Sequence, residues 1–222
     1  MVVQTAIEDA EVIKAGNSAV TFILWLFFAR FVHRAALFNV KFGAPNPDGS
    51  PDRFFGGFIF KGLTLLVASF ILVAPFAFYI FFQAEPPATP TLRQLLPFIL
   101  PSMISYATLL SLAGSWLPAS VYRRNTGLGA ALKRGSRNFF KVFCWIAPTL
   151  LLGAAIELAL IGGSAVVGID ASVIRNASFN PGGALITFVV ALVETVNVSL
   201  IAVVLSHFYL AAEGVAEPVL QN

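Results

Sequence analysis

Long uninterrupted runs of apolar residues dominate the pattern of hydrophobic and polar positions along the chain. A helix needs about 20 mostly apolar residues to cross the ~30 Å hydrocarbon core of a bilayer, because each residue adds ~1.5 Å. Four runs reach this length with at most one charged residue each, and they cover residues 62–82, 95–122, 142–169 and 182–210. The pattern therefore predicts an all-α membrane protein whose four transmembrane helices form two tandem hairpins.

A shorter apolar stretch near the N-terminus precedes these four runs. Residues 16–32 are long enough to cross a bilayer at the low end of the spanning range. Arg30, His33 and Arg34 continue this stretch at helical spacing, which suits a helix at the inner membrane surface. We expect a helix over residues 16–38 that is embedded in the membrane without fully crossing it, with a fifth spanning helix as the alternative.

Composition agrees with a membrane protein and assigns its orientation. The chain is 58% hydrophobic and 11% charged, whereas a soluble domain is about half apolar and a quarter charged. Of its 14 Lys and Arg, eleven lie between residues 30 and 61 or between the second and third predicted spans, two lie in the other loops, and Lys14 is left unassigned. Because cytoplasmic loops carry the excess of Lys and Arg, we expect this side and the C-terminus to be cytoplasmic, in the inner (plasma) membrane of a bacterium. The net charge of +3 then reflects topology, and nucleic acid is not an expected partner.

The two halves of the chain share a pattern that predicts an internal repeat. The phenylalanines from Phe54 and the Thr-Leu-Leu run from Thr64 recur 85 residues later, from Phe139 and Thr149. Two hairpins of the same orientation are typical of parallel repeats, and a chance match among Phe- and Leu-rich helices is the alternative. The predicted segments are an N-terminal helix with a cytoplasmic loop (1–61), a first hairpin (62–122), a basic amphipathic cytoplasmic segment (123–141), a second hairpin (142–210) and a cytoplasmic tail (211–222).

Residues 128–143 combine an apolar and a basic helical face. Apolar and small residues recur there at spacings of three and four, and Lys133, Arg137 and Lys141 lie one turn apart on another face, with Arg134 beside them. We expect a basic amphipathic helix that lies on the inner leaflet before the chain turns into the membrane. These four cations then bind anionic lipid headgroups or anchor the topology.

This basic segment carries a resemblance to a known family. Residues 127–141 read Gly-Leu-Gly-Ala-Ala-Leu-Lys-Arg-Gly-Ser-Arg-Asn-Phe-Phe-Lys and precede an apolar span. The run resembles segments that precede the hydrophobic hairpins of YciC-like bacterial membrane proteins, and it is similar to the membrane domain attached to some glycerophosphodiester phosphodiesterases. The resemblance covers residues 127–152 and, more loosely, the rest of the chain, and it implies an integral membrane protein. The first half departs from the pattern, because residues 41–52 form a Pro/Gly/Asp loop there.

Two acids inside the predicted spans are the main candidates for chemistry. Glu157 and Glu194 both lie some 21–24 Å above the inner ends of their helices, so they share a depth, and Asn197 follows Glu194 one turn later. An isolated carboxylate in hydrocarbon takes up a proton rather than staying charged. An ionisable residue within the membrane indicates a functional site by default. We consider a proton or cation site used in transport, neutral acids hydrogen-bonded to Asn197 or to backbone, and a contact for a basic residue of a partner.

Other catalytic and metal-binding patterns are missing from the sequence. The chain has no phosphate loop, dinucleotide fingerprint or His-Glu-x-x-His helix. Its two histidines, His33 and His207, lack an accompanying carboxylate or Cys ligand, so we expect neither a metal nor a cofactor. Cys144 is expected to be a small buried hydrophobe, with palmitoylation as the alternative.

These observations predict a non-catalytic membrane protein. We expect an accessory, assembly or membrane-integrity subunit that contacts lipid and other membrane subunits, or further copies of itself. The alternative is a small proton- or cation-coupled transporter that uses Glu157 and Glu194.

Overall fold

The computed structural model describes residues 21–41, 55–83, 92–169, 172–175 and 178–215. An N-terminal helix, Thr21–Phe38, is followed by the helices α2 (Phe55–Gln83), α3 (Leu92–Ala113), α4 (Trp116–Tyr122), α5 (Leu128–Val166) and α6 (Pro181–Glu213). Between α5 and α6 lie two short antiparallel strands, β1 (Ile174–Arg175) and β2 (Ser178–Phe179).

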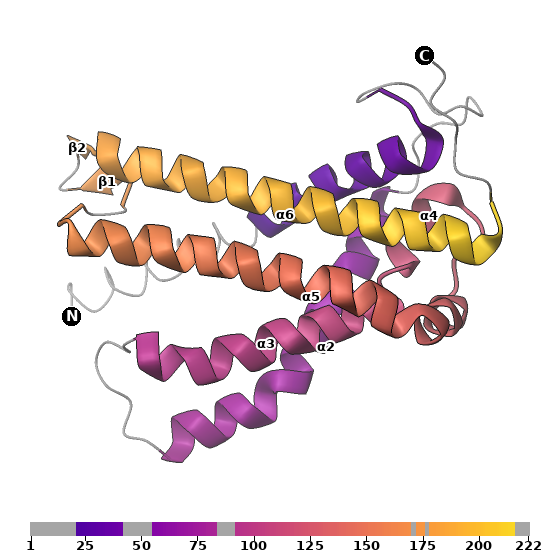
Figure 1. The fold of residues 1–222 in the computed structure, drawn as a ribbon, viewed down its shortest axis with the longest axis horizontal. Helices are drawn as coiled ribbons and strands as arrows, with labels where there is room; N and C mark the ends of the chain where they lie inside the picture. Colours follow the sequence, from indigo (N-terminus) through magenta and orange to yellow (C-terminus); the bar gives the residue numbers. More distant parts are fainter. Residues whose placement is uncertain (1–20, 42–54, 84–91, 170–171, 176–177, 216–222) are drawn as a thin grey trace, which may run out of the picture.

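The predicted fold class, an all-α membrane protein, is confirmed. The N-terminal helix, α2, α5 and α6 are each long and apolar enough to cross a membrane, and α3 with α4 makes a fifth such passage when that bent pair is taken as one span. In Figure 1, α5 and α6 run side by side along the long axis, with the strands at one end and α4 at the other. Helix α3 packs against both α2 and α5, so the two predicted hairpins lie against each other. The internal repeat between them stays a prediction.

The N-terminal helix packs into the bundle between α2 and α6. Leu26 lies against Gly62 of α2, and the His33 ring meets the edge of Phe58 of α2 at a centroid distance of 5.7 Å. Its basic face points inward, because Arg30, His33 and Arg34 are all buried. The spacing of these three residues therefore marks a side of the helix that packs inside the bundle, and the helix has the length and composition of a span.

The second predicted span is broken rather than continuous. Helix α3 ends at Ala113 and α4 begins at Trp116, and the two helices are bent by 41°. The break falls on Gly114 and Ser115, a residue pair that commonly kinks helices. The Ser115 hydroxyl donates to the Ala131 carbonyl of α5 at 3.4 Å, which ties the break to a neighbouring helix.

The basic segment and the third span form one helix. Helix α5 is continuous over 39 residues, so the predicted boundary at residue 141 is not marked by an interruption. Near its start, Gly135 lies against the backbone of Leu112 of α3, and a Cβ there would overlap the Leu112 carbonyl. This contact joins the two hairpins at the end of the molecule where α4 lies.

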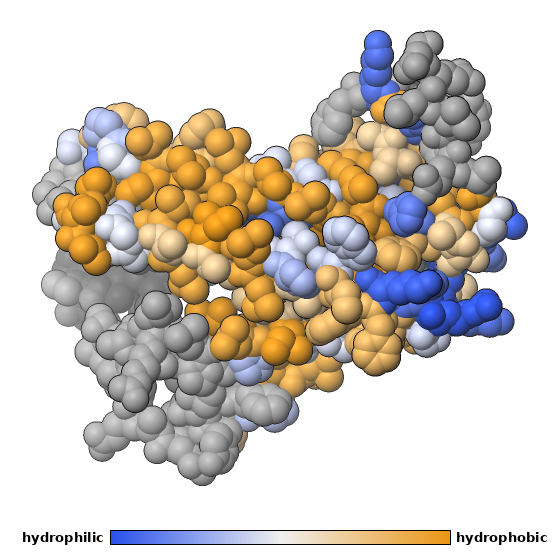
Figure 2. Space-filling view, in the orientation of Figure 1, coloured by the Kyte–Doolittle hydropathy of each residue, from blue (hydrophilic) through white to orange (hydrophobic). Residues whose placement is uncertain are grey.

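The hydrophobic core occupies the half of the bundle nearest α4. Leu110 of α3, Leu117 of α4, Ile146 of α5 and Leu205 of α6 meet there as fully or nearly fully buried side chains. The visible surface of α5 and α6 is mostly apolar, and hydrophilic residues gather at the end where α5 begins (Figure 2). This distribution is the one expected of helices whose outer surface faces lipid.

Candidate functional site

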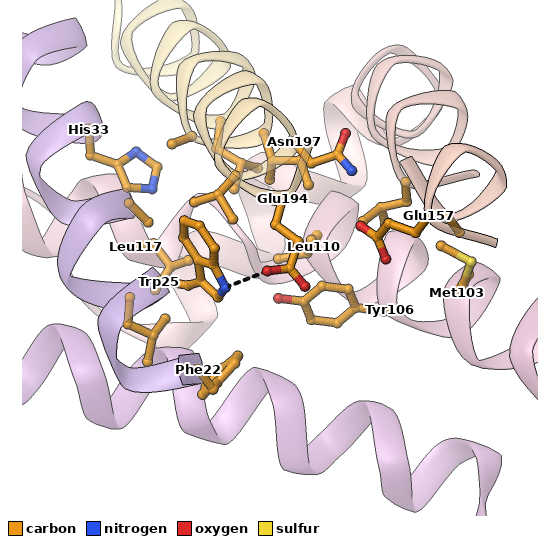
Figure 3. Close-up of a pocket in the computed structure, with 18 residues that line it drawn as sticks. Phe22, Trp25, His33, Met103, Tyr106, Leu110, Leu117, Glu157, Glu194 and Asn197 are labelled. Atoms are coloured by element: carbon orange, nitrogen blue, oxygen red, sulfur yellow. Dashed lines mark hydrogen bonds between the residues drawn. The ribbon is translucent and has the colours of Figure 1, made fainter. Parts of the chain in front are cut away.

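Glu157 and Glu194 line the same cavity. The cavity has a volume of about 320 Å³ and lies between the N-terminal helix, α3, α4, α5 and α6. Figure 3 shows the two carboxyl groups reaching into it from facing helices. Residue counting predicted that the two acids share a depth, and both line this one site.

The N-terminal helix supplies the hydrogen-bond partner of Glu194. Trp25 Nε1 donates to Glu194 Oε2 at 3.1 Å (Figure 3). The Trp25 ring also meets the Phe28 ring edge-on at a centroid distance of 6.2 Å. Sequence reasoning missed Trp25, because it lies 169 residues from Glu194 and no local pattern relates the two.

Aromatic rings complete the lining around the acids. Phe22 and Trp25 come from the N-terminal helix and Tyr106 comes from α3. In Figure 3 the hydroxyl end of Tyr106 points toward the Glu194 carboxyl. No Lys or Arg is among the described residues that line the cavity. Carboxylates combined with aromatic faces favour a cationic guest, because both attract positive charge.

Asn197 lines the cavity but serves a different contact from the predicted one. Its side-chain amide lies against Gly153 of α5, so that a Cβ at Gly153 would overlap it. Figure 3 shows the amide directed toward α5 and away from the Glu194 carboxyl. The glycine is required because the two helices approach closely at this level. The hydrogen bond to Glu194 comes from Trp25 instead.

The two histidines do not converge. His33 is 1% exposed and lines the cavity, where its Nδ1 lies 2.7 Å from the Ser206 hydroxyl of α6. His207 is exposed and lies beside the Phe208 ring. Within the described part of the chain, no three His, Cys, Asp or Glu side chains gather as a metal site requires.

The four basic residues of early α5 fall into two groups. Lys133, Arg137 and Lys141 are exposed, whereas Arg134 is buried. Arg134 Nη1 lies 2.8 Å from Glu213 Oε1 of α6, its Nε donates to the Ser115 hydroxyl at 3.3 Å, and its guanidinium lies over the Tyr209 ring. Arg134 therefore does not belong to the exposed basic face that was predicted to bind headgroups. The sequence did carry a signal for this, because the small residues Ala131 and Gly135 lie beside Arg134 on the helix, and both are buried in the structure.

Cys144 departs from its predicted environment. It was expected to be a buried hydrophobe, but its side chain is exposed on α5, so that prediction is wrong. The outer surface of a membrane helix tolerates a small apolar side chain as readily as a core does, because lipid is also apolar.

Comparisons with family models, with curated proteins and with solved structures find no match to this chain. The resemblance to the YciC-like proteins stays a prediction.

Proposed function

We propose that this protein is a small proton-coupled cation transporter of the membrane, with Glu157 and Glu194 as its coupling site. One observation carries the proposal: two carboxyls from α5 and α6 share a cavity with aromatic rings. Acids within membrane helices are expensive to bury and characteristically mark ion pathways. We prefer this function to the accessory subunit expected from the sequence pattern, because a packing module has no need of such a cavity.

The helix break between α3 and α4 supports the same function. Leu110 and Leu117 flank the break, and both line the cavity. Transporters place interrupted helices beside their binding sites, because the ends of the half-helices and the unwound backbone between them can bind ions.

Proton flux in proteoliposomes tests this function. Vesicles containing a trapped pH-sensitive dye are exposed to gradients of Na⁺, K⁺ or tetraethylammonium. We expect a cation gradient to drive proton movement with the wild type, and Glu157→Gln or Glu194→Gln to slow it at least ten-fold. Thr195→Val is the control, since Thr195 adjoins Glu194 but bonds the Ala191 carbonyl within α6. Equal flux in vesicles with wild type, variants and no protein would overturn the proposal.

A partner-binding function is the second candidate, and the exposed face of α6 favours it. Leu185, Phe188 and Leu192 are large apolar side chains exposed on this helix. Such a face also suits contact with a second membrane subunit. Gentle detergent extraction followed by mass spectrometry identifies co-purifying subunits. Loss of a specific subunit in Phe188→Ala, without any change in flux, would establish this function instead.

The orientation proposed here is a cytoplasmic C-terminus in a bacterial inner membrane. It is supported by the excess of Lys and Arg near the start of α5. Single cysteines at Gly127 and Ala88, in a chain with Cys144→Ser, are tested with a membrane-impermeant thiol reagent; position 88 lies outside the described residues. We expect labelling of position 88 from outside the cell, and labelling of position 127 only after the membrane is opened. Labelling of position 127 in intact cells would reverse the orientation.

A further inference from the structure

Helices α5 and α6 enclose two more cavities on the outside of the bundle. One has a volume of about 660 Å³ and lies where α5 begins and α6 ends. The other, about 490 Å³, lies further along the same pair of helices, among apolar side chains. Neither shares the acids described above. The first cavity is lined by cations and the second by apolar side chains, so together they indicate the kind of ligand that fits them.

The first cavity is cationic. Its lining includes Lys133, Arg134 and Arg137 together with the single carboxylate of Glu213. That carboxylate is already bound, since Arg134 lies 2.8 Å and Arg124 3.5 Å from its oxygens, and the Asn125 amide donates to it at 2.7 Å. The exposed Lys133 and Arg137 therefore remain to attract an anion. Three cations and one carboxylate give the lining a net charge of +2, which suits a phosphate group.

The second cavity is apolar and lies on the same side of both helices. Trp145 and Leu152 line it from α5, and Val196 and Leu200 line it from α6. Arg137, Lys141, Trp145 and Leu152 recur at spacings of four and seven, so they form one stripe along α5. The 15 residues from Arg137 to Leu152 span roughly 22 Å, which exceeds the depth of one leaflet, about half of a ~30 Å hydrocarbon core.

The surface between the two cavities, which together with them is called the α5/α6 groove, is partly cationic and partly apolar. Lys141 of α5 is exposed there, and His207 of α6 is exposed on the stripe that continues from Leu200 toward the end of the helix. A lysine at this level lays its methylene stem along apolar surface and directs its ammonium toward the headgroup region. The site is thus cationic at the end of the bundle and apolar toward its middle, as an amphiphile requires.

We propose that the α5/α6 groove binds one anionic phospholipid. Its phosphate lies in the cationic cavity beside Lys133 and Arg137, and an acyl chain follows the apolar cavity past Trp145 and Leu152. Charge complementarity selects this occupant, because a zwitterionic lipid or a plain alkyl chain leaves the cations unmatched. The site is independent of the acids on the inner side of the same helices and does not depend on the transport proposal.

Native mass spectrometry of the detergent-solubilised full chain tests the headgroup part of the site. Wild type is titrated with phosphatidylglycerol and, separately, with phosphatidylcholine of the same chain length. We expect one phosphatidylglycerol to bind at least ten-fold more tightly than phosphatidylcholine, and Lys133→Gln/Arg137→Gln to abolish that preference. Lys41→Gln is the control, because Lys41 is exposed and does not line the cavity. An equal loss in the control, or no preference in wild type, would overturn the proposal.

A second pair of measurements distinguishes a lipid from a free phosphate compound. Leu152→Trp fills the apolar cavity, and we expect it to weaken binding of the long-chain lipid at least five-fold while sparing dihexanoyl phosphatidylglycerol. Glycerol phosphate should not displace the long-chain lipid at equal concentration. Displacement by glycerol phosphate, or an unchanged long-chain affinity in Leu152→Trp, would show that no acyl chain occupies the groove. Lys133, Arg137 and Leu152 are all exposed, and the thermal unfolding temperature verifies that each variant is folded.

Discussion

Glu194 and Glu213 stand on the same helix, yet their surroundings are opposite. Glu213 lies at the end of α6 with its side chain 7% exposed, and it has Arg134 at 2.8 Å and the Asn125 amide at 2.7 Å. Glu194 lies in the body of α6, where it faces a second acid, Glu157, and accepts one hydrogen bond from Trp25. The Glu213 carboxylate is therefore paired with a cation, whereas the Glu194 carboxyl shares its cavity with a second carboxyl.

This difference separates a structural acid from a functional one. A buried ion pair stabilises a fold chiefly because removing either partner leaves an uncompensated charge. Placing two like acids in one cavity does not itself stabilise the fold, so their presence favours a binding role. Substitutions at these residues and their neighbours test whether stability depends on Glu213 and function on the Glu157–Glu194 pair, as this contrast requires.

Arg134→Gln should have the largest effect on stability. It leaves the Glu213 carboxylate buried without its nearest cation, and it also removes the donor to Ser115. We expect the free energy of unfolding, measured by denaturant titration in detergent, to fall by about 3–5 kcal/mol. The control, Arg137→Gln on the exposed side of the same helix, should change it by less than about 0.5 kcal/mol. Similar losses in both variants would mean that the Arg134–Glu213 pair has no special structural role.

Gly153→Ala should have the next largest effect, because it changes the contact between α5 and α6 beside the acids. The new Cβ overlaps the Asn197 amide, which must leave its position. We expect a loss of about 1–3 kcal/mol in the free energy of unfolding. Gly162→Ala on the same helix meets open space and should be neutral or stabilising by up to about 1 kcal/mol. The double variant Gly153→Ala/Asn197→Ala should recover part of the loss; no recovery would contradict the assigned contact.

Trp25→Phe should weaken the fold modestly. It keeps an aromatic ring but removes the Nε1 donor to Glu194, one hydrogen bond worth about 1 kcal/mol. Thermal unfolding in detergent measures the change, with Trp145→Phe on the exposed face of α5 as the comparison. If the Trp145 variant were the less stable of the two, the Trp25–Glu194 bond would not be stabilising the N-terminal helix.

Glu157→Gln should have the smallest effect on stability. The substitution preserves shape and removes the repulsion between two carboxyls, so we expect the free energy of unfolding to stay within about 0.5 kcal/mol of wild type or to rise slightly. Glu213→Gln is the matched control, and it should destabilise the protein because it weakens the pair with Arg134. A larger loss for Glu157→Gln than for Glu213→Gln would reverse the assignment of the two acids.

The sequence pattern predicted the features that depend on local chain geometry. The length of an apolar run determines whether a helix crosses the membrane, and the rise per residue placed Glu157 and Glu194 at one depth. The cavity that these two acids line agrees with that estimate. The fold class followed from the same reasoning, as did the two hairpins.

Only the tertiary structure decided which side of each helix faces another helix. It brought Trp25 to Glu194, turned Arg134 inward to Glu213, placed Cys144 outside and broke the second span at Gly114 and Ser115. In a soluble protein, apolar periodicity marks the buried side of a helix, because the opposite side meets water. In this chain the outer surface meets lipid, which is as apolar as the core, so the same periodicity does not distinguish them. Contacts between segments 169 residues apart therefore depended on how the helices pack, and this is where the candidate site was formed.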